Sequence, residues 1–132
     1  MNHLKKETEL LWASEKYTVM AKGYNFYKEV QRLMRDAQSD GDYTEITVMI
    51  AKFKVKPFER RALCNTLEHV WGYFKKSADE YDKKHFFELV ETLRRSDDDY
   101  FDEIPYEIDL FLHYMLQKYP SDYLLRSTFI QR

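Results

Sequence analysis

The sequence has few of the residues that sheets and tight turns require. It contains three glycines and three prolines among 132 residues, where an average chain carries roughly 12% of the two together. An all-β chain places both residues at its many turns, so their scarcity favours helices. The hydrophobic fraction of 44% and the charged fraction of 33% are those of an ordinary globular protein. We therefore predict an all-α fold, a single domain over residues 1–132 built as a bundle of six or seven helices.

Several functional classes lack the residues that they need. Cys64 is the one cysteine, which excludes an intrachain disulfide and an iron–sulphur cluster held by this chain's own thiolates. The formal net charge of −2 gives no global attraction to nucleic acid or anionic membranes. No apolar run approaches the roughly 20 residues of a membrane span, and none follows the first lysines as in a signal peptide. We expect a soluble, cytoplasmic protein without a cofactor.

Apolar residues recur at helical spacing through most of the chain. The first predicted helix covers residues 4–22 and ends at Gly23, and Asn25 is the predicted cap of the second. Predicted starts of the later helices are a capping box at Asp42 and Glu45, Pro57, a capping box at Ser77 and Glu80, Pro105, and Ser121.

The segment 43–56 permits two interpretations. Residues 52–56 alternate with period two, as in a strand. A helical stripe is also present, formed by Tyr43, Ile46, Met49, Ile50 and Phe53, and the sequence offers no partner strand. Because a lone strand leaves its backbone hydrogen bonds unmade, we predict a helix to about Phe53.

The predicted helix 57–76 carries an unusual polar row, formed by Asn65, His69, Gly72 and Lys76. These residues lie on one face, opposite the apolar stripe from Leu63 to Phe74. A glycine inside a helix lowers helix stability by about 1 kcal/mol relative to alanine, so its presence needs an explanation. The row either packs against a neighbouring helix, with His69 and Asn65 hydrogen-bonded across, or contacts a ligand or partner; catalysis is a third interpretation.

Basic residues gather around Pro57: Lys52, Lys54, Lys56, Arg60 and Arg61. A predicted helix start adds its partial positive charge. Lys56, Arg60 and Arg61 are therefore candidates for an anion site, although the cluster is better explained as a solvated basic face.

Motifs for metal or nucleophilic chemistry are weak or missing. Asp82 with His85 and Asp109 with His113 have spacings that could supply two metal ligands each, but such pairs are common on helices. No phosphate-binding loop or nucleophile motif is present. Cys64 adjoins the buried stripe, which indicates an inert thiol. We predict no metal site and no catalytic residue.

Motifs along most of the chain resemble the YbgA-like family of small bacterial helical domains. The matching stretches are Leu11-Trp12-Ala13, Lys16-Tyr17, Met20-Ala21, Lys56-Pro57, Asn65-Thr66-Leu67-Glu68-His69, Gly72-Tyr73-Phe74-Lys75, Ile104-Pro105, His113 and Asp122-Tyr123-Leu124. Glu15 and Leu63 stand where the family often has histidines, and Ser127-Thr128-Phe129-Ile130 with the chain end replaces its usual Gln-x-Tyr-Leu-like stretch and Pro-containing tail.

The resemblance implies a helical domain of unassigned activity, found alone or fused behind a cysteine-rich domain of the thiouracil-desulfidase type. It also implies an accessory role in sulphur or nucleobase metabolism, with a desulfidase-type domain as a partner supplied in trans. The candidate binding residues are Lys16, Tyr17, Asn65, His69, Gly72, Tyr73 and Lys76.

Three functions follow as expectations. The first is a non-catalytic accessory module that binds a partner protein or a small ligand. The second is an enzyme with His69 as general base, in which Asn65 and Tyr73 orient a nucleobase-like substrate. The third is nucleic-acid binding through the basic residues of segment 52–61.

Overall fold

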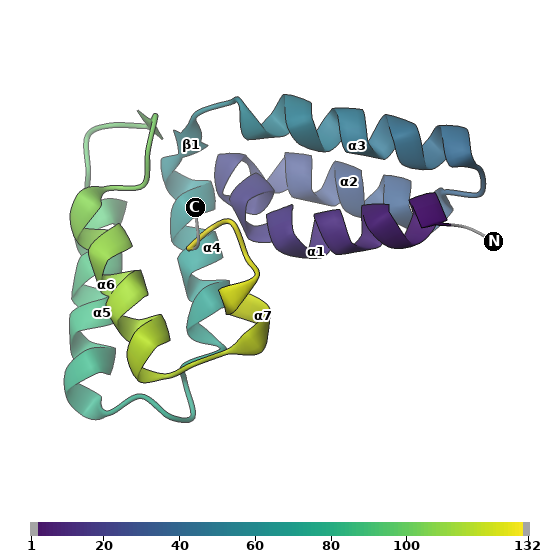
Figure 1. The fold of residues 1–132 in the computed structure, drawn as a ribbon. Coiled ribbons are helices and arrows are strands. Elements are labelled where there is room, and N and C mark those ends of the chain that lie inside the picture. Colours follow the sequence, from purple (N-terminus) through teal and green to yellow (C-terminus); the bar gives the residue numbers. More distant parts are fainter. Residues whose placement is uncertain (1–2, 131–132) are drawn as a thin grey trace.

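The computed structural model describes residues 3–130, and the all-α prediction is confirmed (Figure 1). The described part of the chain forms seven helices and two strands of two residues each. The elements, in order, are α1 His3–Lys22, α2 Tyr24–Asp36, α3 Asp40–Lys54, β1 Phe58–Glu59, α4 Arg60–Trp71, α5 Glu80–Arg94, β2 Tyr100–Phe101, α6 Tyr106–Lys118 and α7 Asp122–Leu125.

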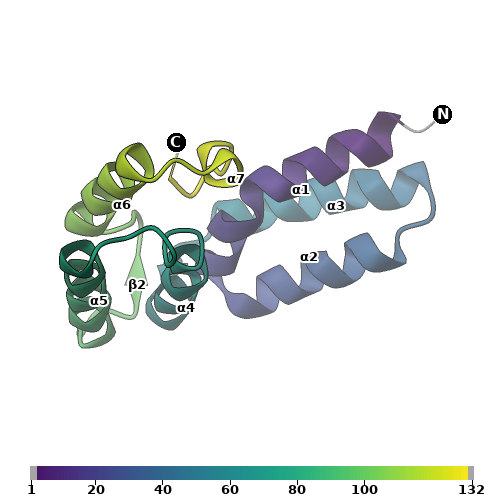
Figure 2. The same ribbon diagram turned by 90° about the horizontal axis from the view of Figure 1, so that it is seen from below.

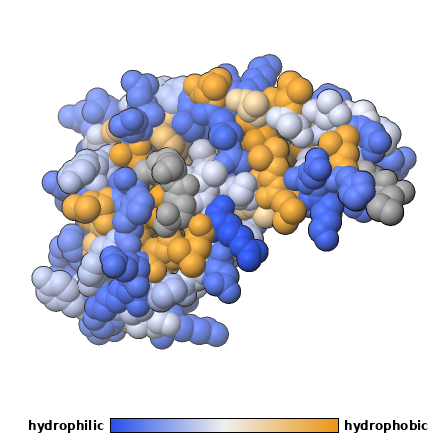
Figure 3. All heavy atoms as spheres, viewed as in Figure 1, coloured by the Kyte–Doolittle hydropathy of each residue, from blue (hydrophilic) through white to orange (hydrophobic). Residues whose placement is uncertain are grey.

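The helices form two groups that share α1. Helices α1, α2 and α3 lie side by side, whereas α4 to α7 gather at one end of that unit (Figures 1 and 2). Helix α1 contacts α2, α3 and α4. In Figure 3, apolar residues are exposed among polar ones on the surface of both groups.

Each group has its own apolar core. Trp12 and Val19 of α1 pack with Val30, Ile46 and other residues of α2 and α3. Residues 17, 20 and 21 of the same helix belong instead to the larger core of α4 to α7. Helix α1 therefore joins the two cores, and its last turn lies where the groups meet.

Helix α3 confirms the helical interpretation of segment 43–53, because Tyr43, Ile46, Ile50 and Phe53 are its buried residues. Its predicted start is wrong. Ser39 is the N-cap, accepting a hydrogen bond from the Asp42 amide, and the Asp42 carboxylate bonds back to Ser39. Similarly, Gly23 rather than Asn25 occupies the N-cap position of α2.

The predicted helix 57–76 is shorter in the structure. Pro57 precedes β1, which pairs antiparallel with β2 through Phe58 with Phe101 and Glu59 with Tyr100. Helix α4 begins at Arg60, because the Glu59 side chain accepts the Ala62 amide, and it ends at Trp71. Gly72 is therefore the C-cap and not an interior glycine.

Two later helix starts can be compared with the prediction. Asp79 caps α5 instead of Ser77, since its carboxylate accepts the Asp82 amide. Ser121 caps α7, as predicted.

Candidate functional site

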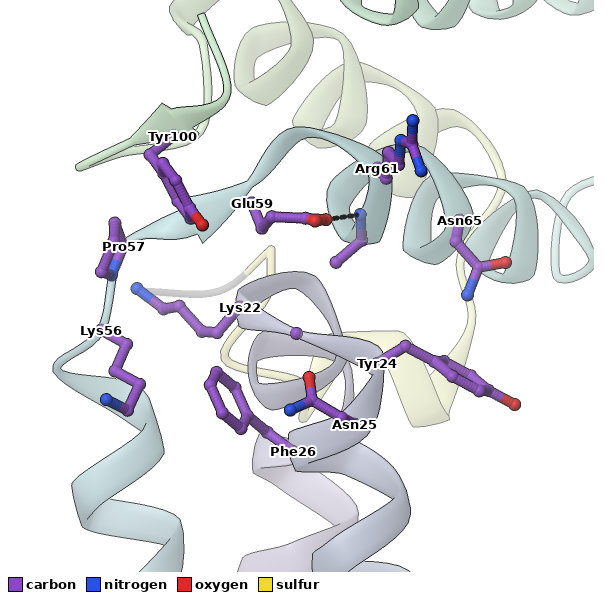
Figure 4. Close-up of a pocket in the computed structure, with 12 residues that line it drawn as sticks. Lys22, Tyr24, Asn25, Phe26, Lys56, Pro57, Glu59, Arg61, Asn65 and Tyr100 are labelled. Atoms are coloured by element: carbon purple, nitrogen blue, oxygen red, sulfur yellow. Dashed lines mark hydrogen bonds between the residues drawn. The ribbon is translucent and has the colours of Figure 1, made fainter.

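A cavity of about 680 Å³ lies where the two helix groups meet (Figure 4). We call it the junction cavity. Its walls come from the end of α1, the start of α2, the connection from α3 to α4, the first turns of α4, and β2. The lining residues are Lys22, Gly23, Tyr24, Asn25, Phe26, Lys56, Pro57, Glu59, Arg61, Ala62, Asn65 and Tyr100.

The chain turns sharply between α1 and α2, and this turn brings Phe26 to the cavity. Gly23 has an extended backbone, with φ of 176°, so its backbone does not itself demand glycine. A Cβ atom built on Gly23 would lie 2.7 and 2.8 Å from two carbons of the Phe26 ring. The missing side chain thus leaves room for Phe26, which stacks on Phe53 with ring centroids 4.5 Å apart.

The opposite wall depends on the small sheet and the first turns of α4. Pairing of Glu59 with Tyr100 places the Tyr100 ring at the cavity, although the two residues are distant in sequence. Arg61 and Asn65 are four residues apart on α4 and therefore share a face. In Figure 4 the Asn65 amide points toward Tyr24, whereas the Arg61 guanidinium points outward at the rim.

The cavity wall is electropositive. Lys22, Lys56 and Arg61 line it, against the single carboxylate of Glu59. Glu59 already caps α4, with 2.9 Å between its Oε1 and the Ala62 nitrogen. Lys22 is 9% exposed, and its Nζ lies 3.7 Å from the centre of the Phe58 ring, a cation–π geometry that tolerates burial of the ammonium.

The structure separates the predicted basic cluster. Lys56 and Arg61 reach the junction cavity, but Arg60 turns toward the loop before β2, where it donates to the Asp98 and Arg94 carbonyls and to the Asp99 carboxylate. The hydrogen bond that Arg60 donates to the Asp99 carboxylate raises the pKa of the Arg60 guanidinium. Lys54 forms an ion pair with the buried Glu15. The Ala62 amide at the start of α4 donates to Glu59. Of the three anion-site candidates, Lys56 and Arg61 line the junction cavity and Arg60 does not.

Three predicted binding residues meet elsewhere. The Tyr17 and Tyr73 hydroxyl oxygens are 3.0 Å apart, and Tyr73 stacks on Tyr123 with ring centroids 5.7 Å apart. The Nζ of Lys16 lies 5.4 and 5.5 Å from the Tyr17 and Tyr123 ring centres. The pKa of Tyr17 is raised above its ordinary value, mainly because the side chain is buried and secondly because its hydroxyl is hydrogen-bonded to Tyr73. This tyrosine cluster joins α1, the segment after α4, and α7.

The remaining members of the polar row face outward. His69, Gly72 and Lys76 are exposed, and a Cβ atom on Gly72 would meet within 4 Å only the His69 carbonyl oxygen. The hypothesis that the row packs against a neighbouring helix is therefore wrong. The row depended on a helix continuing to residue 76, whereas α4 ends at Trp71. Asn65 alone of the row lines the junction cavity.

Two further predictions concern sulphur and metal chemistry. Cys64 is buried, and burial raises the pKa of its thiol, as an inert cysteine requires. Residues 3–130 contain no group of three or more His, Cys, Asp or Glu side chains placed to hold a metal ion. Asp82 does not face a metal partner but accepts hydrogen bonds from Tyr114, Lys118 and Tyr119.

Several cavity residues were absent from the predicted site: Lys22, Tyr24, Asn25, Phe26, Glu59 and Tyr100. The sequence did contain one signal. Glu15, Thr18 and Lys22 recur at helical spacing on α1 and are all buried. A polar row on a face that also carries core residues indicates a polar interior site, and this row ends at the junction cavity.

Fold and site together define a small helical domain with a ligand-sized, positively lined cavity between two helix groups. A family model for a protein domain of unknown function, DUF1722, matches residues 16–132. The chain belongs to this family. No curated protein and no solved structure matches it. Among the described residues, no helix combines the length and apolar character needed to cross a membrane.

Proposed function

We propose that the chain is a binding module for a small ligand that combines an anionic group with a planar unsaturated ring. One observation carries the proposal: the junction cavity presents cations, amides and aromatic rings together. Its volume of about 680 Å³ lies within the range of small-molecule sites.

The cationic residues favour an anionic ligand group. Three positive side chains line the cavity, and the one carboxylate there is engaged in capping α4. Lys22 enters from α1 and Lys56 from the segment after α3, while Arg61 stands at the rim. The guanidinium of Arg61 and the ammonium of Lys56 suit a phosphate or a carboxylate, and the buried Lys22 adds its positive charge to the wall.

The rings and amides favour a planar ligand part. Tyr24 is 46% exposed and Tyr100 is 64% exposed, and together with Phe26 they offer aromatic surface on different walls. Asn25 and Asn65 each provide a donor and an acceptor that can bond to the edge of a heterocycle. A nucleotide meets both conditions, since its base is planar and its phosphate is anionic, and such a ligand would suit an accessory role in sulphur or nucleobase metabolism. A desulfidase-type partner in trans would then act on the ligand that this domain retains.

The two other functions have less support. His69 is exposed, Asn65 lines the junction cavity, and the Tyr73 hydroxyl pairs with Tyr17, so the three residues proposed for an enzyme point to different places. Nucleic-acid binding would draw on Lys52, Lys56 and Arg61, since Lys54 and Arg60 already have acidic partners.

Isothermal titration calorimetry tests the proposal. The titrants are uridine monophosphate, uracil, 2-thiouracil, inorganic phosphate and a single-stranded oligonucleotide. We expect uridine monophosphate, the small titrant with both a ring and an anionic group, to bind more tightly than phosphate or the free bases.

Matched variants locate the site. Arg61→Gln and Tyr100→Ser should each weaken binding about fivefold or more, whereas Lys76→Gln, on an exposed residue away from the cavity, should not change it. The proposal is wrong if none of the small ligands binds, or if both cavity variants bind as the wild type does. Tight, salt-sensitive binding of the oligonucleotide alone would favour the nucleic-acid function.

A further inference from the structure

An apolar groove runs between α5 and α6, separate from the junction cavity. It consists of two adjoining hollows of about 620 and 410 Å³. Leu89 and Glu107 line both hollows, so the two form one continuous groove. None of the residues that line it also lines the junction cavity.

Large apolar side chains remain exposed along this groove. Tyr81 is 80% exposed, Tyr106 75%, Leu110 57% and Tyr114 43%. Aromatic residues with an apolar floor are the usual anchors of protein interfaces. Leu89 and Phe111 supply such a floor here.

The length of the groove fits a helix. Its lining extends along α5 from Tyr81 in the first turn to Ser96 after the last turn. At 1.5 Å per residue this is about 22 Å, or roughly four helical turns. An amphipathic helix of about 14 residues would cover the groove, as in other helix-in-groove complexes.

Charge indicates the chemistry of that helix. Glu107 lines both hollows and therefore stands where they join, at the centre of the groove. Asp82 is neutralised by Lys118, 2.9 Å from its Oδ2. Among the described residues 3–130, no lysine or arginine lines either hollow. An acidic apolar groove repels nucleic acids and anionic membranes and attracts a basic helix.

We propose that the groove between α5 and α6 docks an amphipathic α-helix of a partner protein, with a lysine or arginine of that helix facing Glu107. The apolar stripe of the partner helix covers Leu89, Leu110 and Phe111, and its basic residue pairs with the carboxylate at the centre of the groove.

A peptide library tests this interaction surface. The library displays 14-residue amphipathic helices with a fixed apolar stripe and randomised flanking positions, and it is selected against the wild-type chain and two variants. The wild type should enrich lysine or arginine at one flanking position. Glu107→Lys should instead enrich aspartate or glutamate at the same position, a reversal that a nonspecific apolar surface would not produce.

Leu110→Asp places a charge on the exposed apolar wall and should reduce capture of the selected peptides at least tenfold. Circular dichroism serves to check that this surface variant is folded. The proposal is overturned if the wild type selects no helix, or if Glu107→Lys leaves the enriched residue unchanged. It is also overturned if sedimentation shows a wild-type dimer that Leu110→Asp converts to a monomer, since the occupant would then be a second copy of the chain. The ligand titrations of the junction cavity are independent of each of these results.

Discussion

The hydroxyl groups of Tyr17 and Tyr73 face each other across the boundary between α1 and the segment after α4, with 3.0 Å between the two oxygens. The two partners differ in burial, because Tyr17 is 6% exposed and Tyr73 is 38% exposed. Removing either hydroxyl therefore leaves its partner in a different environment.

Tyr73→Phe should destabilise the protein more than Tyr17→Phe. The first change leaves the buried Tyr17 hydroxyl without its partner, at a cost of about 1–3 kcal/mol. The second leaves the Tyr73 hydroxyl, which can bond to water, so the cost should be below about 1 kcal/mol. Urea denaturation of both variants measures the difference, and the double variant should be more stable than Tyr73→Phe alone. Equal losses in the two single variants would contradict this account of the cluster.

Breaking the ion pair of Glu15 and Lys54 by removing Lys54 should cost more stability than breaking an ordinary surface pair. The Glu15 side chain is 2% exposed and that of Lys54 42%, so Lys54→Met leaves a buried carboxylate without its cation. We expect a loss of about 1–3 kcal/mol in the free energy of unfolding. Lys52→Met is the matched control, because Lys52 is exposed two residues away, and it should stay within about 0.5 kcal/mol of wild type. Similar urea midpoints for the two variants would show that Lys54 contributes little.

The bonds to Asp82 should make stability depend on pH under acidic conditions. Burial acts to raise the pKa of Asp82, but hydrogen bonds from Lys118, Tyr119 and Tyr114 outweigh it and lower the pKa below its ordinary value. A carboxylate whose pKa is lowered in the folded state contributes stability above its unfolded pKa of about 3.9, and this contribution is lost as pH falls through the folded value.

Urea denaturation at several pH values from 6 down to 2.5 measures this effect. The wild type should lose stability below about pH 4, whereas Asp82→Asn should be less stable at pH 6 and show a shallower decline. Asp97→Asn, in the exposed loop before β2, should retain the wild-type slope. If Asp82→Asn also retained that slope, the carboxylate would not be the group that titrates.

The fold could be predicted because most of the chain carries a local signal. The helical stripe of Tyr43, Ile46 and Ile50 correctly predicted a helix and not a strand at α3, and Ser121 marked the start of α7. Periodicity failed at Pro57, where two residues form a strand too short to show alternation. Its partner, Tyr100–Phe101, follows an acidic run that resembles a plain loop.

The candidate site could be predicted only in part, since it depends on contacts between distant segments. Asn65, Lys56 and Arg61 were recognised by type and spacing, and the structure brings these three to the junction cavity. Tyr100 reaches that cavity only through the β1–β2 pairing. Gly72 and Lys76 were assigned to the row because the expected helix was too long, whereas His69 lies within α4 and is exposed.

Gly23 gives a direct test of how tightly the junction cavity is built. In Gly23→Ala the new Cβ atom would approach the Phe26 ring to 2.7 Å and the Asn25 Oδ1 to 2.9 Å. The Phe26 ring is stacked on Phe53 and cannot move away without disturbing the α2–α3 contact. Overpacking of this kind costs about 1–3 kcal/mol, and a displaced ring would also narrow the cavity.

Gly41→Ala is the control, because its nearest neighbour would be Ser39 Oγ at 3.7 Å and its position lies in the first turn of α3. That variant should be neutral or stabilised by up to about 1 kcal/mol. If thermal denaturation showed the same stability for Gly23→Ala and Gly41→Ala, the close packing of α1, α2 and Phe26 around the cavity would have to be reconsidered.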